Sequence, residues 1–150
     1  MRVVIQRVSE ASVVVDAKTV GAISQGFLVL LGISTEDVET DADWLIQKIV
    51  GLRLFNDSEG IMNASLKEVE GSLLLISQFT LMAATKKGNR PSYIKAARPE
   101  QAVPLYEYFI AAMEKALGQK IETGVFGADM KVNLVNDGPV TIQIDSKNRE

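Results

Sequence analysis

Two short runs of almost purely apolar residues place the strongest limit on how this chain can fold. Residues 27–33 read FLVLLGI, and residues 72–76 read SLLLI. Neither run is long enough to cross a membrane, and a strand without polar alternation must be covered on both faces. We therefore expect two buried central strands, the second of which continues to residue 81.

Other segments, rich in valine and isoleucine or alternating between apolar and polar residues, predict further strands. They are residues 2–8, 11–16, 20–24, 131–135 and 140–145. Ser9-Glu10 is expected to form a tight turn between the first two, and residues 136–139 (NDGP) a turn between the last two. The chain is thus expected to begin like an antiparallel meander.

Apolar positions at helical spacing predict two long helices. In the first, Thr40 is expected to be the N-cap, with Asp43 at the third position. Five acidic residues gather there, but the glycine and final glutamate of a calcium-binding EF-hand are missing, so we interpret them as a helix N-terminus. The second helix is expected over residues 99–117, and Pro104 either sets its first turn apart or kinks it.

Together these elements predict one α+β domain over residues 1–150, with largely antiparallel, barrel-like sheets and two long helices. A chain of 150 residues can bury a core and needs no second domain. The last five residues, 146–150, are polar and are expected to form a flexible tail. The N-terminus lacks a signal-like apolar segment and the chain has no cysteine, so we expect a cytoplasmic protein.

The chain contains no histidine and no cysteine, which excludes several kinds of chemistry. A thiol nucleophile, a thiolate metal site and a Ser-His-Asp relay cannot be built, and a zinc site would need carboxylates alone. We expect no metal and no cofactor.

Residues 71–99 contain no aspartate or glutamate, and they carry five cations: Lys86, Lys87, Arg90, Lys95 and Arg98. Because this segment carries +5 and the whole chain −3, the remainder carries −8. The segment therefore suits an anionic ligand. Residues 86–90, a glycine-containing loop with three of the cations, suit RNA phosphates, although such a loop is also often simply solvated.

Polar side chains interrupt the second apolar run at one end. Ser77, Gln78 and Thr80 break both faces of the strand expected over residues 72–81. Taken alone, such residues satisfy local backbone groups at a strand end more often than they form a site. Residues 136–139, taken alone, are a common turn. Spacing by itself leaves the function of both segments open.

The two segments together closely resemble the signature motifs of the D-aminoacyl-tRNA deacylases, SQFTL at residues 77–81 and NDGPVT at residues 136–141. The resemblance covers nearly the whole chain. It includes QRV at 6–8, ASV at 11–13, RPS at 90–92 and GADM at 127–130. A related family that acts on L-amino acids has a proline-initiated segment in place of SQFTL, so Ser77 and Phe79 favour the D-specific family.

The resemblance implies a homodimeric enzyme that hydrolyses the ester bond of D-aminoacyl-tRNA and releases the free D-amino acid and tRNA. The catalytic segment implied, which lines the pocket for the 3′-terminal adenosine, is Ser77, Gln78, Phe79 and Thr80. The RNA-binding residues expected from the charge pattern are Lys86, Lys87 and Arg90. No membrane, and no protein partner other than a second copy of the chain, is implied.

Further residues are implied to bind the substrate: Gly138, Pro139, Arg7, Phe126 and Met130. The Gly138-Pro139 pair would be joined by a cis peptide bond and would enter the pocket of the partner subunit, with Arg7 as the anchor of its loop. Phe126 and Met130 would pack near the terminal adenosine, although a phenylalanine and a methionine in such a segment are as often simply core.

Because no histidine can serve Ser77 or Thr80 as a base, a covalent acyl-enzyme is not favoured, although Asp, Glu or Lys can in principle substitute. The resemblance implies that backbone N–H groups around Phe79 and Thr80 stabilise the charge on the carbonyl oxygen, while the RNA 2′-hydroxyl helps activate water. A pocket without room for an L side chain would reject L-aminoacyl-tRNA. Glycine would pass, including glycyl-tRNA mischarged on tRNA-Ala.

Two other functions remain open at this point. The cations of residues 86–98 would also serve a non-catalytic nucleic-acid-binding dimer, since vertebrate relatives resembling this family have been linked to DNA at replication origins. Alternatively, the chain is a structural dimer in which residues 77–81 are only core. Turnover of D-Tyr-tRNA but not of L-Tyr-tRNA would separate the three.

Overall fold

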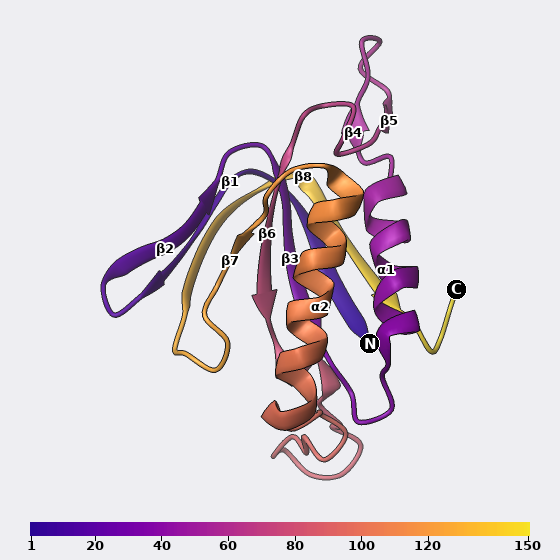
Figure 1. Ribbon diagram of the computed structural model, residues 1–150. Coiled ribbons are helices and arrows are strands. Elements are labelled where there is room, and N and C mark those ends of the chain that lie inside the picture. Colours follow the sequence, from indigo (N-terminus) through magenta and orange to yellow (C-terminus); the bar gives the residue numbers. More distant parts are fainter.

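A six-stranded mixed sheet lies at the centre of the computed structural model, which describes residues 1–150 (Figure 1). Its strands are β1 (Arg2–Val15), β2 (Lys18–Ile23), β3 (Gly26–Gly32), β6 (Ser72–Ser77), β7 (Glu122–Thr123) and β8 (Lys131–Asp145). Five of them follow the order β2-β1-β3-β6-β7, and β8 pairs with β1. A separate two-stranded sheet joins β4 (Phe55–Asn56) to β5 (Met62–Ala64).

Strand β1 connects the parts of this sheet because it pairs with three others. Its first half pairs with β3, its second half with β2, and β8 runs antiparallel along both halves. Only the β3–β6 and β6–β7 pairs are parallel. The prediction of a single α+β domain with largely antiparallel, barrel-like sheets and two long helices is confirmed.

The expected turn at Ser9-Glu10 is wrong, because β1 is one continuous strand. Its pairing with β8 shifts register on either side of Val8, so the two polar residues lie beside an irregularity and face solvent rather than reversing the chain. The reversal comes at Asp16 and Ala17, whose φ angles of 48° and 62° make the tight connection to β2.

The segment at residues 136–139 is likewise not a turn between two strands. Both halves of β8 pair with β1 in the same direction, with Thr141 opposite Gln6 and Asn136 opposite Val8. Four residues of β8, 137–140, therefore stand opposite the single residue Arg7. The chain bulges out of the sheet here without reversing, and we call residues 136–140 the β8 bulge.

The second central strand is shorter than expected. Strand β6 ends at Ser77, opposite Leu31, because its partner β3 ends one residue later at Gly32. Gln78 still donates its N–H to the Leu31 carbonyl at 2.7 Å, and the chain then enters a single 3-10 turn, η1 (Phe79–Met82). The expected alternation of faces therefore stops at Ser77.

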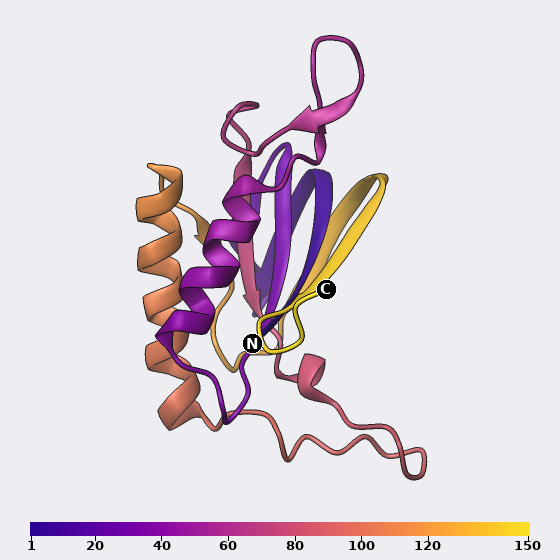
Figure 2. The ribbon, with the colours of Figure 1, turned by 90° about the vertical axis from the view of Figure 1, so that its right-hand side faces the viewer.

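Two helices, α1 (Glu39–Gly51) and α2 (Pro99–Leu117), lie side by side on one face of the sheet (Figures 1 and 2). The range predicted for α2 is confirmed, and the helix continues through Pro104. The cap predicted for α1 is wrong. Its N-cap is Val38, whose N–H is accepted by Asp41 Oδ2 at 3.0 Å, so a carboxylate three residues later replaces the expected Thr40 cap. Neither helix combines the length and apolar character that crossing a membrane requires.

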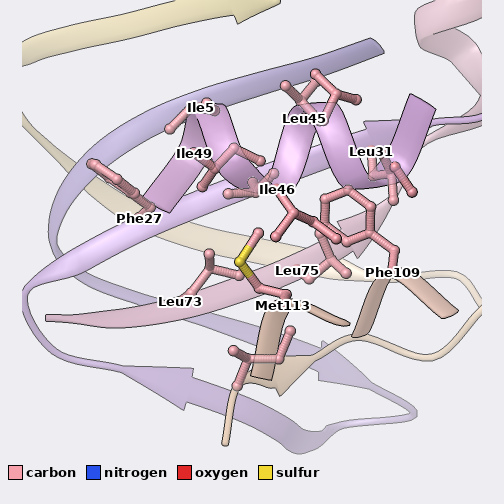
Figure 3. Close-up of a cluster of buried hydrophobic side chains, with 14 of the residues drawn as sticks. Ile5, Phe27, Leu31, Leu45, Ile46, Ile49, Leu73, Leu75, Phe109 and Met113 are labelled. Carbon is pink, nitrogen blue, oxygen red and sulfur yellow. The ribbon is translucent and has the colours of Figure 1, made fainter. Parts of the chain in front are cut away.

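The main core lies between the helices and the sheet (Figure 3). The first central run contributes Phe27, Val29 and Leu31, and the second contributes Leu73 and Leu75, all of them fully buried. The helices cover them with Leu45, Ile49, Phe109 and Met113. Residues of the opposite parity, such as Leu28 and Leu74, fill a smaller cluster on the other face, which confirms that both runs are buried on two sides.

The two ends of the chain meet beside α1. Asp37 accepts a hydrogen bond from the Met1 ammonium group, and Ser146 donates its backbone N–H to the Met1 carbonyl at 2.9 Å. Lys147 pairs with Asp41 at 2.8 Å, and the Arg149 guanidinium lies 4.4 Å from the centre of the Trp44 ring. Asp37 and Asp41, two of the five acidic residues at the start of α1, thus pair with specific cations. Ser146, Lys147 and Arg149 of the expected tail contact the rest of the domain.

Candidate active site

A cavity of about 300 Å³ opens where β6 ends. Ser77, Gln78 and Phe79 line it, together with residues 126–130. The remaining lining is apolar: Leu31, Ile33, Ile76, Ala97, Ala102 and Val132. The fold thus brings Phe126 and Met130 to the segment that was predicted to bind the terminal adenosine.

The end of β3 positions the cavity residues Ser77, Gln78 and Phe79. The hydrogen bond from the Gln78 N–H to Leu31 fixes where β6 stops. Gly32 lets η1 rest directly on β3, because a Cβ at this position would lie 2.9 Å from Leu81 Cβ and 3.0 Å from the Gln78 carbonyl oxygen. Sequence reasoning missed Gly32, since its requirement arises from a contact with residues far along the chain.

Thr80 does not line the cavity, although it was predicted to belong to the catalytic segment. Its hydroxyl oxygen accepts a hydrogen bond from Nε2 of Gln78, the residue directly before η1. Phe79 and Thr80 begin this turn, so their backbone N–H groups have no carbonyl partner inside it. The side chain of Thr80 organises the turn, while its backbone lies next to residues of the cavity wall.

The part of the cavity lining that contains Phe126 and Met130 is held in place by contacts with β6 and α2. Gly124 donates its N–H to the Leu75 carbonyl at 3.0 Å, and a Cβ on Gly124 would lie 2.5 Å from Met130 Sδ. Behind this part of the lining the ring of Tyr106 lies 5.7 Å from that of Phe126, and its hydroxyl donates to the Leu75 carbonyl at 3.2 Å. Burial raises the pKa of Tyr106 to about 12, so this hydroxyl stays protonated and serves as a structural donor.

The β8 bulge lies at the other end of the sheet from the cavity of the same chain. Arg7 anchors it by donating to the Asp137 carbonyl at 2.9 Å and to the Leu54 carbonyl at 2.6 Å. The peptide bond between Gly138 and Pro139 is cis. Arg7, which holds the bulge, pairs with Phe27 near the start of β3, whereas Ser77, which lines the cavity, pairs with Leu31 near the end of β3. The bulge and the cavity therefore lie at opposite ends of this strand. One chain does not bring Gly138 and Pro139 to its own cavity.

Comparison with known proteins identifies what this arrangement is similar to. The model of the D-Tyr-tRNA(Tyr) deacylase family matches residues 4–145. The chain belongs to this family. It is 63% identical over 150 residues to the D-aminoacyl-tRNA deacylase of Cytophaga hutchinsonii and 59% identical to that of Flavobacterium johnsoniae, with both chains covered completely in each case. The family inferred from the sequence motifs is confirmed.

Two solved structures share the fold of this D-Tyr-tRNA(Tyr) deacylase family member. The c-Myc DNA Unwinding Element Binding Protein is 40% identical, with a TM-score of 0.91 over 97% of this chain and 98% of the other. A probable eukaryotic D-amino acid tRNA deacylase has a TM-score of 0.81 over 95% and 97% of the two chains. At 17% identity, the second likeness concerns the fold alone.

The predicted RNA-binding residues of this family member lie on an arm, residues 84–92, that extends away from the body between η1 and α2 (Figure 2). Ala84 and Ser92 close the base of the arm with two backbone hydrogen bonds of 2.8 and 3.0 Å. Lys86, Lys87 and Arg90 are exposed, and no ion pair of the structure involves them. The arm therefore carries free positive charge on a segment that leaves the body shortly after the cavity residues Ser77, Gln78 and Phe79.

The sequence motifs of the D-Tyr-tRNA(Tyr) deacylase family did not point to Tyr93, which follows the arm. Its ring packs edge-to-face on that of Phe79, with 5.1 Å between ring centres and 73° between ring planes. Both residues are among the exposed large hydrophobic residues of the chain. The signal in the sequence was an aromatic residue inside the acid-free segment of residues 71–99.

Proposed function

We propose that this chain hydrolyses the ester bond of D-aminoacyl-tRNA, releasing the free D-amino acid and tRNA. The observation that carries the proposal is the cavity at the end of β6, which Ser77, Gln78 and Phe79 line together with Phe126 and Met130. Relatives about 60% identical over the whole chain are named D-aminoacyl-tRNA deacylases, which supports the same substrate here. A substrate that is charged tRNA is consistent with the cytoplasmic location expected from the sequence.

The reaction proposed is attack of water on the ester carbonyl carbon, which forms a new C–O bond and breaks the bond from that carbon to the 3′-oxygen of the terminal ribose. The 3′-oxygen stays on the ribose and leaves as its hydroxyl group after taking up a proton, and the water oxygen leaves in the carboxylate of the free amino acid. The backbone N–H groups of Phe79 and Thr80 are proposed to stabilise the negative charge that develops on the carbonyl oxygen. Among the side chains that line the cavity only Asp129 is a carboxylate, and it is paired with Lys131 at 2.8 Å. Activation of the water is therefore assigned to the neighbouring 2′-hydroxyl of the substrate.

Rejection of L-aminoacyl-tRNA is proposed to come from a second copy of the chain. The β8 bulge is far from its own cavity, so only the bulge of a partner subunit can place Gly138 and Pro139 beside Ser77 to Thr80. A backbone surface at that place would leave no room for an L side chain, whatever its chemistry. Glycine, which has no side chain, would pass, including glycyl-tRNA mischarged on tRNA-Ala.

The test of this function is ester loss from D-Tyr-tRNA and L-Tyr-tRNA incubated separately with the purified protein. The proposal expects rapid loss from the D-substrate and the uncatalysed rate from the L-substrate. Equal rates on both would contradict the proposed chiral selection. No acceleration on either would contradict the hydrolase assignment.

A non-catalytic nucleic-acid-binding dimer is the second candidate, favoured by the free cations of the arm. The relative with 40% identity is named for binding a DNA unwinding element, which points to the same kind of ligand. This candidate expects tight binding of nucleic acid without any ester loss from D-Tyr-tRNA. The assay above therefore separates it from the deacylase.

Replacing Lys86 and Lys87 together by alanine is expected to weaken tRNA binding and to flatten its dependence on salt. For each phosphate that is no longer neutralised by a lysine, the slope of log K against log [salt] should fall by about 0.7–0.9. A fluorescence binding titration over a range of salt concentrations measures this slope. The matched control replaces Lys67 and Lys115, which are exposed, unpaired and outside the arm. An unchanged slope in the arm variant would remove the arm from RNA binding.

Thr80→Ala is expected to lower kcat by less than about tenfold, because a side-chain hydrogen bond is worth about 0.5–1.5 kcal/mol. The change removes the acceptor for Gln78 Nε2 but keeps the backbone N–H groups of η1. Steady-state kinetics measures kcat, and mass spectrometry of quenched reactions should find no acyl group on the protein. Loss of all turnover in a folded variant, or an acylated Thr80 in the wild type, would overturn the mechanism in which backbone N–H groups and the RNA hydroxyl carry the reaction.

A further inference from the structure

We propose that Tyr93, supported by Phe79, is the stacking surface for the base of the nucleotide that precedes the terminal adenosine of aminoacyl-tRNA. This inference rests on the proposed function and extends its binding site beyond the cavity. Tyr93 is 39% exposed and Phe79 is 56% exposed, so burial in the core does not explain either ring. Their edge-to-face contact holds both rings in place while leaving ring surface open to solvent.

The position of the pair suits the path of an RNA strand that leaves the cavity. Phe79 itself lines the cavity, and Tyr93 touches it from outside. Tyr93 directly follows Ser92, which closes the base of the cationic arm. A strand with its terminal adenosine in the cavity would therefore cross the aromatic pair before its phosphates reach Lys86, Lys87 and Arg90.

The backbone around Tyr93 is held before any ligand arrives. Its carbonyl accepts the Ala96 N–H at 2.9 Å, and the neighbouring Ser92 is bonded to Ala84 in both directions. Thr35 donates its N–H to the Lys95 carbonyl at 3.0 Å, which ties the following residues to the body of the domain. A ring fixed in this way loses little conformational freedom when a base stacks on it.

The charge of the surroundings favours RNA over a second protein surface. Five exposed cations lie in residues 71–99 with no carboxylate among them, and none of the five forms an ion pair. Exposed aromatic rings interleaved with free cations are how proteins bind single-stranded nucleic acid without reading its sequence. Two copies of this segment facing each other would repel.

The first experiment compares two substrates, D-Tyr-tRNA and the D-tyrosyl ester of adenosine, which lacks every upstream nucleotide. Tyr93→Ala should raise KM for the tRNA about tenfold more than KM for the adenosine ester, because only the tRNA supplies a base to stack. Tyr93→Phe keeps the aromatic ring, so the ratio of KM for the tRNA to KM for the adenosine ester should equal that of the wild type. Ile94→Ala is the matched control, because this neighbour is 83% exposed and apolar but has no ring.

An equal change of KM on both substrates in Tyr93→Ala would overturn the proposal, since Tyr93 would then act through the cavity. The same result for Ile94→Ala as for Tyr93→Ala would assign the effect to apolar area rather than to stacking. A change of molar mass by light scattering in Tyr93→Ala would instead make the pair an interface between copies of the chain.

A binding experiment keeps the inference testable if the wild type cleaves neither substrate, which would refute the proposed function. Affinity is measured for an RNA oligonucleotide ending in CCA and for the same RNA with the penultimate base removed. The wild type should bind the abasic RNA about tenfold more weakly, whereas Tyr93→Ala should bind both equally. Equal binding of both RNAs by the wild type would contradict the stacking role independently of catalysis.

Discussion

Gly138→Ala is expected to lower kcat/KM for D-aminoacyl-tRNA about 100-fold, the cost of misplacing a positioning element by about an ångström. Gly138 has a φ of +139°, which L side chains rarely adopt. A Cβ here would lie 2.7 Å from Val140 Cγ2, 2.9 Å from the Val140 nitrogen and 3.1 Å from Arg7 Nη2. The β8 bulge must therefore shift or release its anchor, although residues 77–80 remain intact.

Two measurements separate this effect from general damage. Thermal unfolding should show that Gly138→Ala still folds, since the bulge lies outside both core clusters. The matched control is Gly60→Ala in the hairpin between β4 and β5, where φ is +78° but nothing lies within 4 Å of a Cβ. That variant should keep full activity at a stability cost of about 1–2 kcal/mol. Wild-type turnover by Gly138→Ala would exclude the β8 bulge from the proposed reaction.

Gly26→Ala is expected to destabilise the fold by more than about 4 kcal/mol, a large part of the 5–15 kcal/mol that stabilises a domain. A Cβ on Gly26 would lie 1.8 Å from the Ser72 carbonyl oxygen and 2.8 Å from the Ser72 nitrogen. Both are backbone atoms that cannot rotate away, so β3 and β6 must separate where their parallel pairing begins. Unfolding in urea, monitored by circular dichroism, measures the decrease in the free energy of unfolding.

Two further glycine variants make this result interpretable even if Gly26→Ala fails to fold. Gly21→Ala would meet the Thr123 carbonyl oxygen at 2.9 Å, so it should cost less than Gly26→Ala but remain clearly destabilising. Gly51→Ala, in the last turn of α1 with nothing within 4 Å, should be neutral or stabilising by up to about 1 kcal/mol. If the three variants ranked differently in the stability that they lose, the close approach of backbone atoms to Gly26 and Gly21 would not explain why glycine is needed there.

The sequence determined much of the framework through local pattern. The apolar runs at residues 27–33 and 72–76 correspond to the central strands β3 and β6, buried on both faces. Helix α2 begins at Pro99, and Gly118 in the left-handed conformation follows its last residue, as its terminal residues predicted. These predictions succeeded because side-chain periodicity and the special conformations of proline and glycine act within a few residues.

Where local pattern failed, the pairing of distant strands decided the outcome. Ser9-Glu10 and residues 136–139 have turn composition, yet each lies inside a long strand because β1 and β8 pair with each other on both sides of it. The strand expected to reach residue 81 stops at Ser77 because β3 provides no further partner after Gly32. A polar or glycine-containing segment specifies an irregularity, and the neighbouring strand decides whether it becomes a turn or a bulge.

The candidate site shows the same division. The motif at residues 77–81 and the segment at 126–130 were found in the sequence, but only the tertiary structure brings Ser77, Gln78 and Phe79 of the motif into one cavity with residues 126–130. The contact of Tyr93 with Phe79 and the anchoring of Arg7 to the Leu54 carbonyl likewise join residues that are distant in sequence. Residue types and local spacing show which chemical groups the chain can contribute to a site. Their distances depend on packing between elements, which no local pattern encodes.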